Sequence, residues 1–551
     1  MSEAIQAALE WKYRRQFDYS DGVNSTQRRL APRSDAPPVL LGDTDLRFFL
    51  ANGFVQITPD LDAGFHARMF ERCSELVGED NDHNPGNNLL PLVPELNLVF
   101  EDPVVRGALG SVLGPDYLMH PHRVLHDNPP GSDEQVWHHD SYWGYKRKVH
   151  DHRPWWVMIM YYPQDIYREI GPTGVVPGSY CIAQRLDDID QIGSMAHGPA
   201  GTCMMIHYDI WHRKMKNLTA LKRFMIKFEF TRMSRPGQPS WDVAEPHWSA
   251  PANPPAYDLS PLWRSQYYFL AGRDHAPAPA ETTDSARIST LVQQLDAPRR
   301  EQRLAAANEL ADIRFDNPQS IAALAAHLDD DCEPVGLGSA YALASQGEPG
   351  AKALTQAMLD GDGENVDDPR VFIDEGQDSE AEMQARNAAH GLVAYGSGAA
   401  GLLVDAYDRG QPRVRKYAVY ALGQIGQDSD QVLDTLVRAS ADEDAYVRIN
   451  AVEALGLQRA TEPVVRALIG ALADPDDEVR FNAALSLARL GPGAGAAAGA
   501  LADALYDGNR YVSGYACEAL QRIGTPEALR ALLPFLQSAR WCPITNTKNL
   551  F

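Results

Sequence analysis

The sequence predicts a chain of two parts, a β-rich first half followed by an all-α second half. Up to about residue 275, short β-branched and aromatic runs such as VMIMYY and FMIKFEF alternate with Gly and Pro, and this part holds nine of the ten tryptophans. Beyond it the chain becomes rich in Ala and Leu with the spacing of amphipathic helices. The stretch AGRDHAPAPAETTDS between the halves has the composition of a linker.

Size and charge narrow the classes of function. At about 150 residues per domain, the 551 residues should hold two to four compact units. Hydrophobic residues make up 44% and charged residues 23%, which is an ordinary globular composition. The 74 acidic and 50 basic side chains give a formal net charge of -24, which repels nucleic-acid phosphates and anionic membranes. We therefore expect neither as a partner.

The sequence also favours a soluble, cytoplasmic protein. No window approaches the run of about 18 apolar residues that crosses a membrane, and the first residues lack the basic start and apolar core of a signal peptide. Six cysteines are scattered without any Cys-x-x-Cys pair, which disfavours a disulfide framework and a structural zinc site. We expect them to be reduced thiols.

A repeated motif runs through the second half. The four clearest copies are VRKYAVYALG, VRINAVEALG, VRFNAALSLARLG and VSGYACEALQRIG, offset by 33, 32 and 33 residues and starting at Val414, Val447, Val479 and Val512. Earlier copies start at Gln302 and Val335, and a weaker one starts at Gln384. This period predicts an α-solenoid of paired helices. The pattern resembles a HEAT-repeat array of the short bacterial type over about 285–540.

Arginines at fixed places in the repeats resemble the Asp/Arg ladder of that family. Arg415, Arg448 and Arg480 each follow the motif's first Val, after acidic turns such as DPDDE. We interpret them as structural links between repeats. A solenoid also offers a concave face for partners, so a protein partner or self-association through the repeats remains open.

The first half carries a pattern that suits a metal. In VWHHDSYW, an extended backbone places His138 and Asp140 on one side and His139 on the other. A third ligand must come from elsewhere, and His212 in the segment IHYDIWHRK is the candidate. Two histidines and one carboxylate form the facial triad of non-haem Fe(II) oxygenases, which leaves coordination positions open for a co-substrate and dioxygen.

An arginine in the same segment suggests the co-substrate. Arg223 lies eleven residues after His212 and opens the strand-like run FMIKFEF. A guanidinium one strand beyond the last histidine supplies a bidentate, permanently charged clamp for a carboxylate. This combination predicts 2-oxoglutarate, whose keto acid end would chelate Fe(II) while its far carboxylate meets Arg223.

The full pattern resembles the phytanoyl-CoA dioxygenase family of Fe(II)/2-oxoglutarate oxygenases. It consists of His-x-Asp, the turn GPTGVVPGSY, and then His212 with Asn217 five residues on and Arg223 eleven residues on. The run LRFFLANGFVQITPDLDAGFHARMFERCSEL is similar to that family's opening helix, strand and helix. The resemblance covers roughly 40–240 and implies a double-stranded β-helix, or cupin-like jelly roll, with flanking helices.

The resemblance assigns roles to individual residues. It makes His138, Asp140 and His212 the Fe(II) ligands and Arg223 the anchor for 2-oxoglutarate, with Asn217 and Lys214 beside the co-substrate. Two departures stand out: Tyr180 replaces the histidine of the family's Pro-Gly-Ser-His, and Lys214 replaces a small hydroxyl residue. Lys214 either gives the co-substrate carboxylate a second cation or faces solvent.

Other side chains have two readings each. His207 is the rival third ligand or a core histidine. The remaining candidates line a substrate cavity or belong to the core, and they are His120, His122, His126, Trp137, Trp143, Trp155 and Trp156.

Together these observations predict an Fe(II)- and 2-oxoglutarate-dependent dioxygenase that hydroxylates a C–H bond of a small organic substrate with O2, giving succinate and CO2. Desaturation or ring closure by the same oxidant, an oxygenase acting on a protein or carrier-bound substrate recruited by the repeats, and a non-catalytic interaction protein are the alternatives. The expected layout is an N-terminal extension (1–40), the oxygenase domain (41–272), a linker (273–284), the repeats (285–540) and a tail (541–551).

Overall fold

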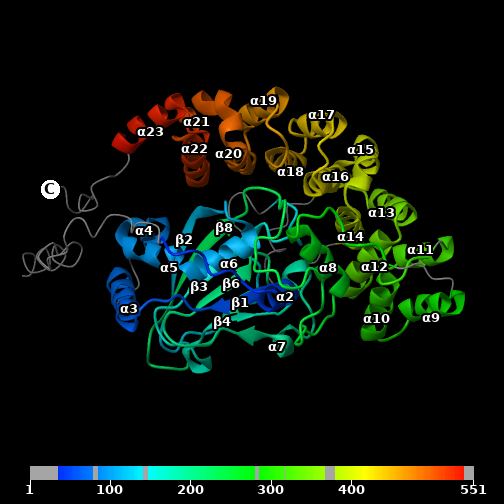
Figure 1. Ribbon diagram of the computed structural model, residues 1–551, viewed down its shortest axis with the longest axis horizontal. Coiled ribbons are helices and arrows are strands. Elements are labelled where there is room, and N and C mark those ends of the chain that lie inside the picture. The colour runs from blue at the N-terminus through cyan, green and yellow to red at the C-terminus, as the bar shows by residue number, and fades with distance from the viewer. Residues whose placement is uncertain are drawn as a thin grey trace, which may run out of the picture.

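The computed structural model describes residues 35–78, 85–140, 147–279, 284–315, 317–365 and 379–538. The second half forms an arch of helices, and the β-rich first half lies against its inner side (Figure 1). Most of the expected N-terminal extension, part of the linker, the tail and Trp143 lie outside the described residues. Within those residues, no helix has the length and hydropathy needed to cross a bilayer.

Helices precede and cover the sheets of the first half. The expected opening of helix, strand and helix is confirmed as α2, β1 and α3. Phe100 of α5 packs on Phe228 and Phe70 of α3 packs on Phe224, so these helices cover one face of the large sheet. The helices are α2 (Asp43–Asn52), α3 (Ala63–Val77), η2 (Gly86–Asn88), α4 (Leu89–Leu92), η3 (Pro94–Leu96), α5 (Asn97–Glu101), α6 (Pro103–Leu113), η4 (Arg168–Ile170), η5 (Ser179–Cys181), α7 (Ile189–Ile192) and α8 (Ser260–Leu270).

Two antiparallel sheets face each other. The large sheet has the order β1-β6-β3-β8-β2 and the small one β5-β4-β7. Tyr162, just after β3, donates a 2.7 Å hydrogen bond to Thr173 of β4, across the gap between the sheets. The strands are β1 (Phe54–Ile57), β2 (Leu118–Asn128), β3 (Trp156–Tyr161), β4 (Thr173–Val175), β5 (Ser194–Met195), β6 (Cys203–His207), β7 (His212–Lys214) and β8 (Arg223–Thr231). This is the expected cupin-like jelly roll.

Strand β8 divides its side chains between the two faces of the large sheet. Its phenylalanines point toward the helices, and its odd-numbered residues therefore point into the space between the sheets. The antiparallel register pairs Arg223 with Asn128, Met225 with His126 and Lys227 with Val124 of β2. A polar stripe thus enters an otherwise apolar core.

The second half is the expected array of paired helices. Every copy of the motif lies on an even-numbered helix from α10 to α22, and these helices form the inner row of the arch (Figure 1). The helices are α9 (Ser285–Leu295), α10 (Arg300–Ala311), α11 (Pro318–Ala325), α12 (Glu333–Ser345), α13 (Glu348–Asp360), α14 (Glu380–Tyr395), η7 (Ser397–Ala399), α15 (Ala400–Arg409), α16 (Pro412–Ile425), α17 (Asp430–Ala439), α18 (Ala445–Gly456), α19 (Glu462–Ala471), α20 (Asp477–Leu490), η8 (Gly491–Ala497), α21 (Ala498–Ala504), α22 (Arg510–Ile523) and α23 (Pro526–Ser538).

The arginine ladder is confirmed. Arg415 pairs with Asp442 at 2.9 Å, and each following pair repeats this link one unit further along. The two later pairs are Arg448 with Asp474 at 2.9 Å and Arg480 with Asp507 at 2.7 Å. Each arginine thus reaches the acidic turn before the next inner helix.

Buried polar contacts join the two halves. Arg153 donates to the backbone carbonyl of Gln424 in α16, and Trp155 donates to the side chain of the same Gln424 at 2.8 Å. Lys148 lies between Asp151 at 2.6 Å and Glu453 of α18 at 2.9 Å. The inner row of the solenoid is therefore bound to the first half of its own chain.

Candidate metal site

A backbone bridge brings two distant histidines together. His138 and His212 exchange both backbone hydrogen bonds, at 3.1 and 3.0 Å, as a hydrogen-bonded pair of antiparallel strands does. Their side chains therefore leave the same face, and the ring centroids lie 4.5 Å apart. His139 points the other way, as expected, and packs on Trp211 at 4.1 Å.

Backbone carbonyls set the tautomers of both rings. Nδ1 of His138 donates to the carbonyl of Val136 and Nδ1 of His212 to that of Ile210, each at 3.0 Å, because a carbonyl can only accept. This leaves the lone pair on each Nε2, the arrangement found in metal-ligating histidines. The two Nε2 atoms face Oδ1 of Asp140, at 3.9 Å from His138 and 3.6 Å from His212.

These three residues form a group that fits one metal ion. Their ligand atoms all lie within 4.8 Å of one another. Small side-chain rotations would bring each atom to the roughly 2.1 Å that a first-row metal requires. Two imidazoles and one carboxylate match the facial triad of non-haem Fe(II) sites. The side chains of His138 and Asp140 are 22% and 17% exposed, so the site has an open side.

A lysine holds the second oxygen of Asp140. Nζ of Lys227 donates to Oδ2 at 2.6 Å, which leaves Oδ1 toward the imidazoles. Burial raises the pKa of Asp140, but the charges of Lys227, His212 and His138 outweigh it and hold this pKa well below its usual range. Burial lowers the pKa of His212 to about 4 against the opposing pull of Asp140. At neutral pH the site therefore offers a carboxylate and a neutral imidazole, both competent metal ligands.

Arg223 lies on the same face of β8 as Lys227. Four residues of strand separate their Cα atoms by about 13 Å. Arg223 is 1% exposed, and its Nε donates to the carbonyl of Gly171 at 3.0 Å. Burial lowers its pKa, with Tyr162 and Asp127 opposing the shift. No carboxylate in the described part of the chain forms an ion pair with this guanidinium, so a buried cation is left able to take an anionic ligand.

Asn217 holds the loop between β7 and β8. Its Nδ2 donates to the carbonyls of Asn128 at 3.0 Å and Leu221 at 2.8 Å, and its Oδ1 accepts from Thr219. Because Asn128 pairs with Arg223 in the sheet, Asn217 supports the strand ends that carry the guanidinium. Lys214 is partly exposed on β7, and its backbone N–H donates to Gln135 at 3.1 Å. Any contact of these two side chains with a co-substrate remains a prediction.

His207 lies apart from the triad. It is buried against the ring of Tyr180, with centroids 4.5 Å apart, and its Nδ1 accepts from the backbone N–H of Asp209 at 3.2 Å. Tyr180 in turn bonds the carbonyl of Leu50 and the side chain of Gln266, so the departure from the family's pattern is a core contact. The group of possible ligands described above does not include His207.

The three alternating histidines of β2 have different surroundings. Burial lowers the pKa of His126 to about 3. The charges of Lys227 and Asp140 also act on this pKa, because His126 faces the charged groups of the site. His120 and His122 lie on the same inner side, 3.7 and 4.0 Å from Glu229, and also contact tyrosines of α22. The break in register between Met119 and Arg123 adds two residues to β2, so the alternation of the three histidines is kept.

Sequence reasoning missed Lys227 and Glu229. Burial raises the pKa of Glu229 to about 8, against the opposing charge of Lys227. A signal was present, because two charges at alternate positions of the apolar run FMIKFEF must both point into the core side of the sheet. We interpreted that run only as a strand.

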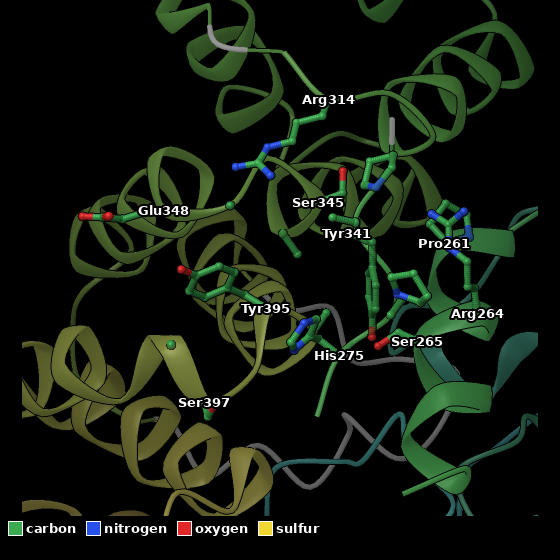
Figure 2. Close-up of a pocket in the computed structure, with 18 residues that line it drawn as sticks. Pro261, Arg264, Ser265, His275, Arg314, Tyr341, Ser345, Glu348, Tyr395 and Ser397 are labelled. Atoms are coloured by element: carbon green, nitrogen blue, oxygen red, sulfur yellow. The ribbon is translucent and has the colours of Figure 1, made fainter. Parts of the chain in front are cut away.

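A separate cavity lies between α8 and the first repeats. It has a volume of about 460 Å³, and none of the triad residues lines it. Figure 2 shows Arg264 and Ser265 on one side and Arg314, Glu348 and Tyr395 on the other. The cavity therefore belongs to the junction of the two halves.

Comparisons with known proteins agree with a chain of two parts. A family model of HEAT repeats matches residues 288–368, 371–456, 433–505 and 465–541. The second half therefore consists of HEAT repeats. A search of curated proteins found no match.

Solved structures of non-haem oxygenases match the first part of the chain. The nickel complex of the non-haem monooxygenase ThoJ is 17% identical, with a TM-score of 0.28 over 42% of this chain and 96% of that one. HygX from Streptomyces hygroscopicus, with nickel, 2-oxoglutarate and hygromycin B bound, is 17% identical, with a TM-score of 0.29 over 35% and 87%. The α-ketoglutarate-dependent carbocyclase SnoK from nogalamycin biosynthesis is 15% identical, with a TM-score of 0.30 over 41% and 98%.

Proposed function

We propose that the chain is an Fe(II)- and 2-oxoglutarate-dependent dioxygenase that hydroxylates a C–H bond of a small organic substrate. The observation that carries this proposal is the convergence of His138, Asp140 and His212, with both Nδ1 atoms held by carbonyls and both Nε2 atoms facing one carboxylate oxygen. Fe(II) bound there, with 2-oxoglutarate and O2, supplies the oxidation, and succinate and CO2 are the co-products.

Individual residues of the chain would bind the metal or the co-substrate. His138 and His212 offer nitrogen ligands, and Lys227 turns Asp140 into a ligand through one oxygen. Bound through one oxygen only, Asp140 would leave coordination positions of the metal open for a keto acid and O2. Arg223 would hold the far carboxylate of 2-oxoglutarate by two parallel hydrogen bonds. Because Asp140 fills the position that a halide would need, hydroxylation is favoured over halogenation.

The buried cation of Arg223 supports the choice of an anionic co-substrate. A guanidinium without a paired carboxylate is unfavourable in a protein interior, since desolvation is then uncompensated. Arg223 is such a group in the described structure, and a dicarboxylate would remove the penalty. Lys214, on the strand that carries His212, remains the candidate for a second cation near the same ligand.

The alternative of a protein substrate recruited by the repeats has less support. The inner helices α16, α18 and α22 contact the first half of the same chain through Gln424, Glu453 and Tyr515. The concave side, which repeat arrays commonly use for partners, is thus engaged within the chain. Partners would have to use the outer row. A non-catalytic interaction protein would not require the convergence of the three ligands with a buried Arg223.

The test is turnover of 2-oxoglutarate by the full chain. Purified protein given Fe(II), ascorbate and 2-oxoglutarate in air should form succinate slowly even without the organic substrate. His212→Ala should abolish this reaction. His207→Ala is the matched control, because it removes the rival histidine, and it should retain succinate formation. Absence of both metal uptake and succinate from the unmodified protein would overturn the proposal.

A further inference from the structure

A buried network of polar side chains starts at the metal site and leads away from it. Lys227, which holds Oδ2 of Asp140, also lies 3.4 Å from Oε1 of Glu229. Glu229 is fully buried. Nε2 of His120 is 3.7 Å from Oε2 and Nε2 of His122 is 4.0 Å from Oε1 of this carboxylate. The second oxygen of Asp140 is therefore connected to two histidines on β2.

This network of polar side chains ends on the solenoid. Nδ1 of His120 lies 2.7 Å from the hydroxyl of Tyr515, and Nδ1 of His122 lies 2.6 Å from the hydroxyl of Tyr511. Each Nδ1 thus shares a hydrogen bond with the hydroxyl of its tyrosine. The rings of His120 and Tyr511 are also stacked, with centroids 5.4 Å apart. Both tyrosines are buried and lie on α22.

Because these groups are buried, the position of each one affects the position of its neighbours. A buried charge is stabilised only by partners held at fixed positions, and loss of one partner is felt by the others in the network. Lys227 stands between two carboxylates, and the position of Glu229 decides how Lys227 meets Asp140. Glu229 packs within 4.0 Å of the two histidines, without a hydrogen bond from its carboxyl oxygens to either ring, and the histidines are held by α22.

We propose that Tyr511 and Tyr515 of the solenoid are positioning residues of the metal site, acting through His120, His122, Glu229 and Lys227 on Asp140. This inference rests on the proposed function, since it requires a metal at the triad. It gives the HEAT repeats a role in the chemistry: helix α22 fixes which oxygen of Asp140 faces the metal. The repeats thus complete the support of a site whose ligands all lie in the other half.

The experiment measures Co(II) binding to the full chain, because Co(II) occupies Fe(II) sites and its visible absorption reports the coordination geometry. The double variant Tyr511→Phe/Tyr515→Phe removes only the two hydroxyl groups. We expect it to bind Co(II) about 10-fold or more weakly, the range found when an outer-shell partner is removed. We also expect a changed absorption band. Melting temperatures are recorded for every variant.

A matched control separates this role from general stabilisation. The hydroxyl of Tyr341 on α12 lies 3.0 Å from Nδ1 of His152, so Tyr341→Phe removes the same kind of bond between the two halves. His152 has no contact with Glu229 or Lys227 among the described interactions. Tyr341→Phe should therefore lower the melting temperature by a similar amount while leaving Co(II) affinity and absorption unchanged.

Each result decides the inference. Weaker binding in the double variant but not in Tyr341→Phe supports it, and equal binding in all three proteins overturns it while the proposed function stands. No Co(II) binding by the unmodified chain overturns the proposed function, and the inference falls with it. If the double variant does not fold, Glu229→Gln and the single variant Tyr511→Phe replace it, and unchanged Co(II) binding in both would overturn the inference.

Discussion

Lys227 and Asp140 form an ion pair of 2.6 Å in the space between the two sheets. The pair gives the carboxylate two different oxygens, one bound to an ammonium group and one facing two imidazoles. It also joins a group on strand β8 to a residue on the segment that precedes β3. Four predictions follow from this pair, from Arg223 and from the junction of the two halves.

Removal of the lysine should destabilise the protein. Lys227→Met leaves Asp140 and Glu229 buried without their shared cation, and breaking a buried pair of this kind costs about 3 to 5 kcal/mol. Calorimetry should show a lower melting temperature. The double variant Lys227→Met/Asp140→Asn should recover much of the loss, since it also removes the carboxylate charge that Lys227 compensates. Equal melting temperatures of the single variant and the unmodified protein would contradict this account of the pair.

Substitution of the buried arginine should weaken 2-oxoglutarate binding. Loss of one partner of a buried charge pair costs about 2 to 5 kcal/mol, so Arg223→Met should raise the dissociation constant at least about 30-fold. Arg223→Lys should restore only part of the affinity, because an ammonium group cannot form the bidentate pair. Titration of 2-oxoglutarate into the nickel-loaded variants measures both dissociation constants.

Lys214→Met is the comparison for the same titration. If Lys214 faces solvent, its variant binds 2-oxoglutarate as the unmodified protein does. A loss comparable to that of Arg223→Met would instead make Lys214 a second anchor. Unchanged affinity in Arg223→Met would refute the assignment of Arg223.

The junction of the two halves should lose stability in acid. His152 and His390 stack at 3.5 Å between centroids, and burial lowers the pKa of His152 to about 3 and that of His390 well below its usual value. Both are neutral in the folded and unfolded states above pH 6.5. Below that value the unfolded state takes up protons and the folded state does not, so stability falls as the pH falls. At pH 5 the loss is about 2 kcal/mol per histidine.

Melting temperatures between pH 7.5 and 5 measure this effect. His390→Phe keeps a ring against His152 and removes one titrating group, so its melting temperature should fall less steeply with decreasing pH. Equal slopes for this variant and the unmodified protein would show that the stacked pair does not cause the acid sensitivity.

The first half should not fold alone. In a chain that ends at residue 279, Lys148 loses Glu453, while Arg153 and Trp155 lose Gln424. Without the repeats, buried aromatic side chains such as Trp155 become exposed to water, and we expect this fragment to aggregate or to melt well below the full chain. Size-exclusion chromatography and circular dichroism test this. Gln424→Ala in the full chain should give an intermediate melting temperature. A monomeric fragment as stable as the full chain would contradict the prediction.

Local spacing predicted much of the architecture. The repeat period located the helices that carry the motif and predicted that Arg415, Arg448 and Arg480 link neighbouring repeats, because each unit repeats one contact. The spacing of His138 and Asp140 gave two members of the triad for a similar reason, since an extended backbone fixes which side chains share a face. The residues that the sequence could not place depend on contacts over long distances in the chain.

Tyr511 and His122 show the limit most clearly. They are 389 residues apart, and no pattern within either segment indicates that a tyrosine of the last repeats meets a histidine of β2. Lys227 and Glu229 could be recognised as core-facing, but their partners could not. The outer part of the site is therefore a property of how the two halves dock.

The distance along the chain between β2 and α22 also sets an order in time. A ribosome that adds about 5 to 20 residues per second makes Tyr511 some 20 to 80 s after His122. From the synthesis of His212 onward, which is most of that interval, the nascent polypeptide contains every ligand of the triad but not the hydroxyl groups of Tyr511 and Tyr515. A metal ion that binds before α22 is made therefore meets a triad without this outer support. The complete site forms only after the last repeats have docked on the first half.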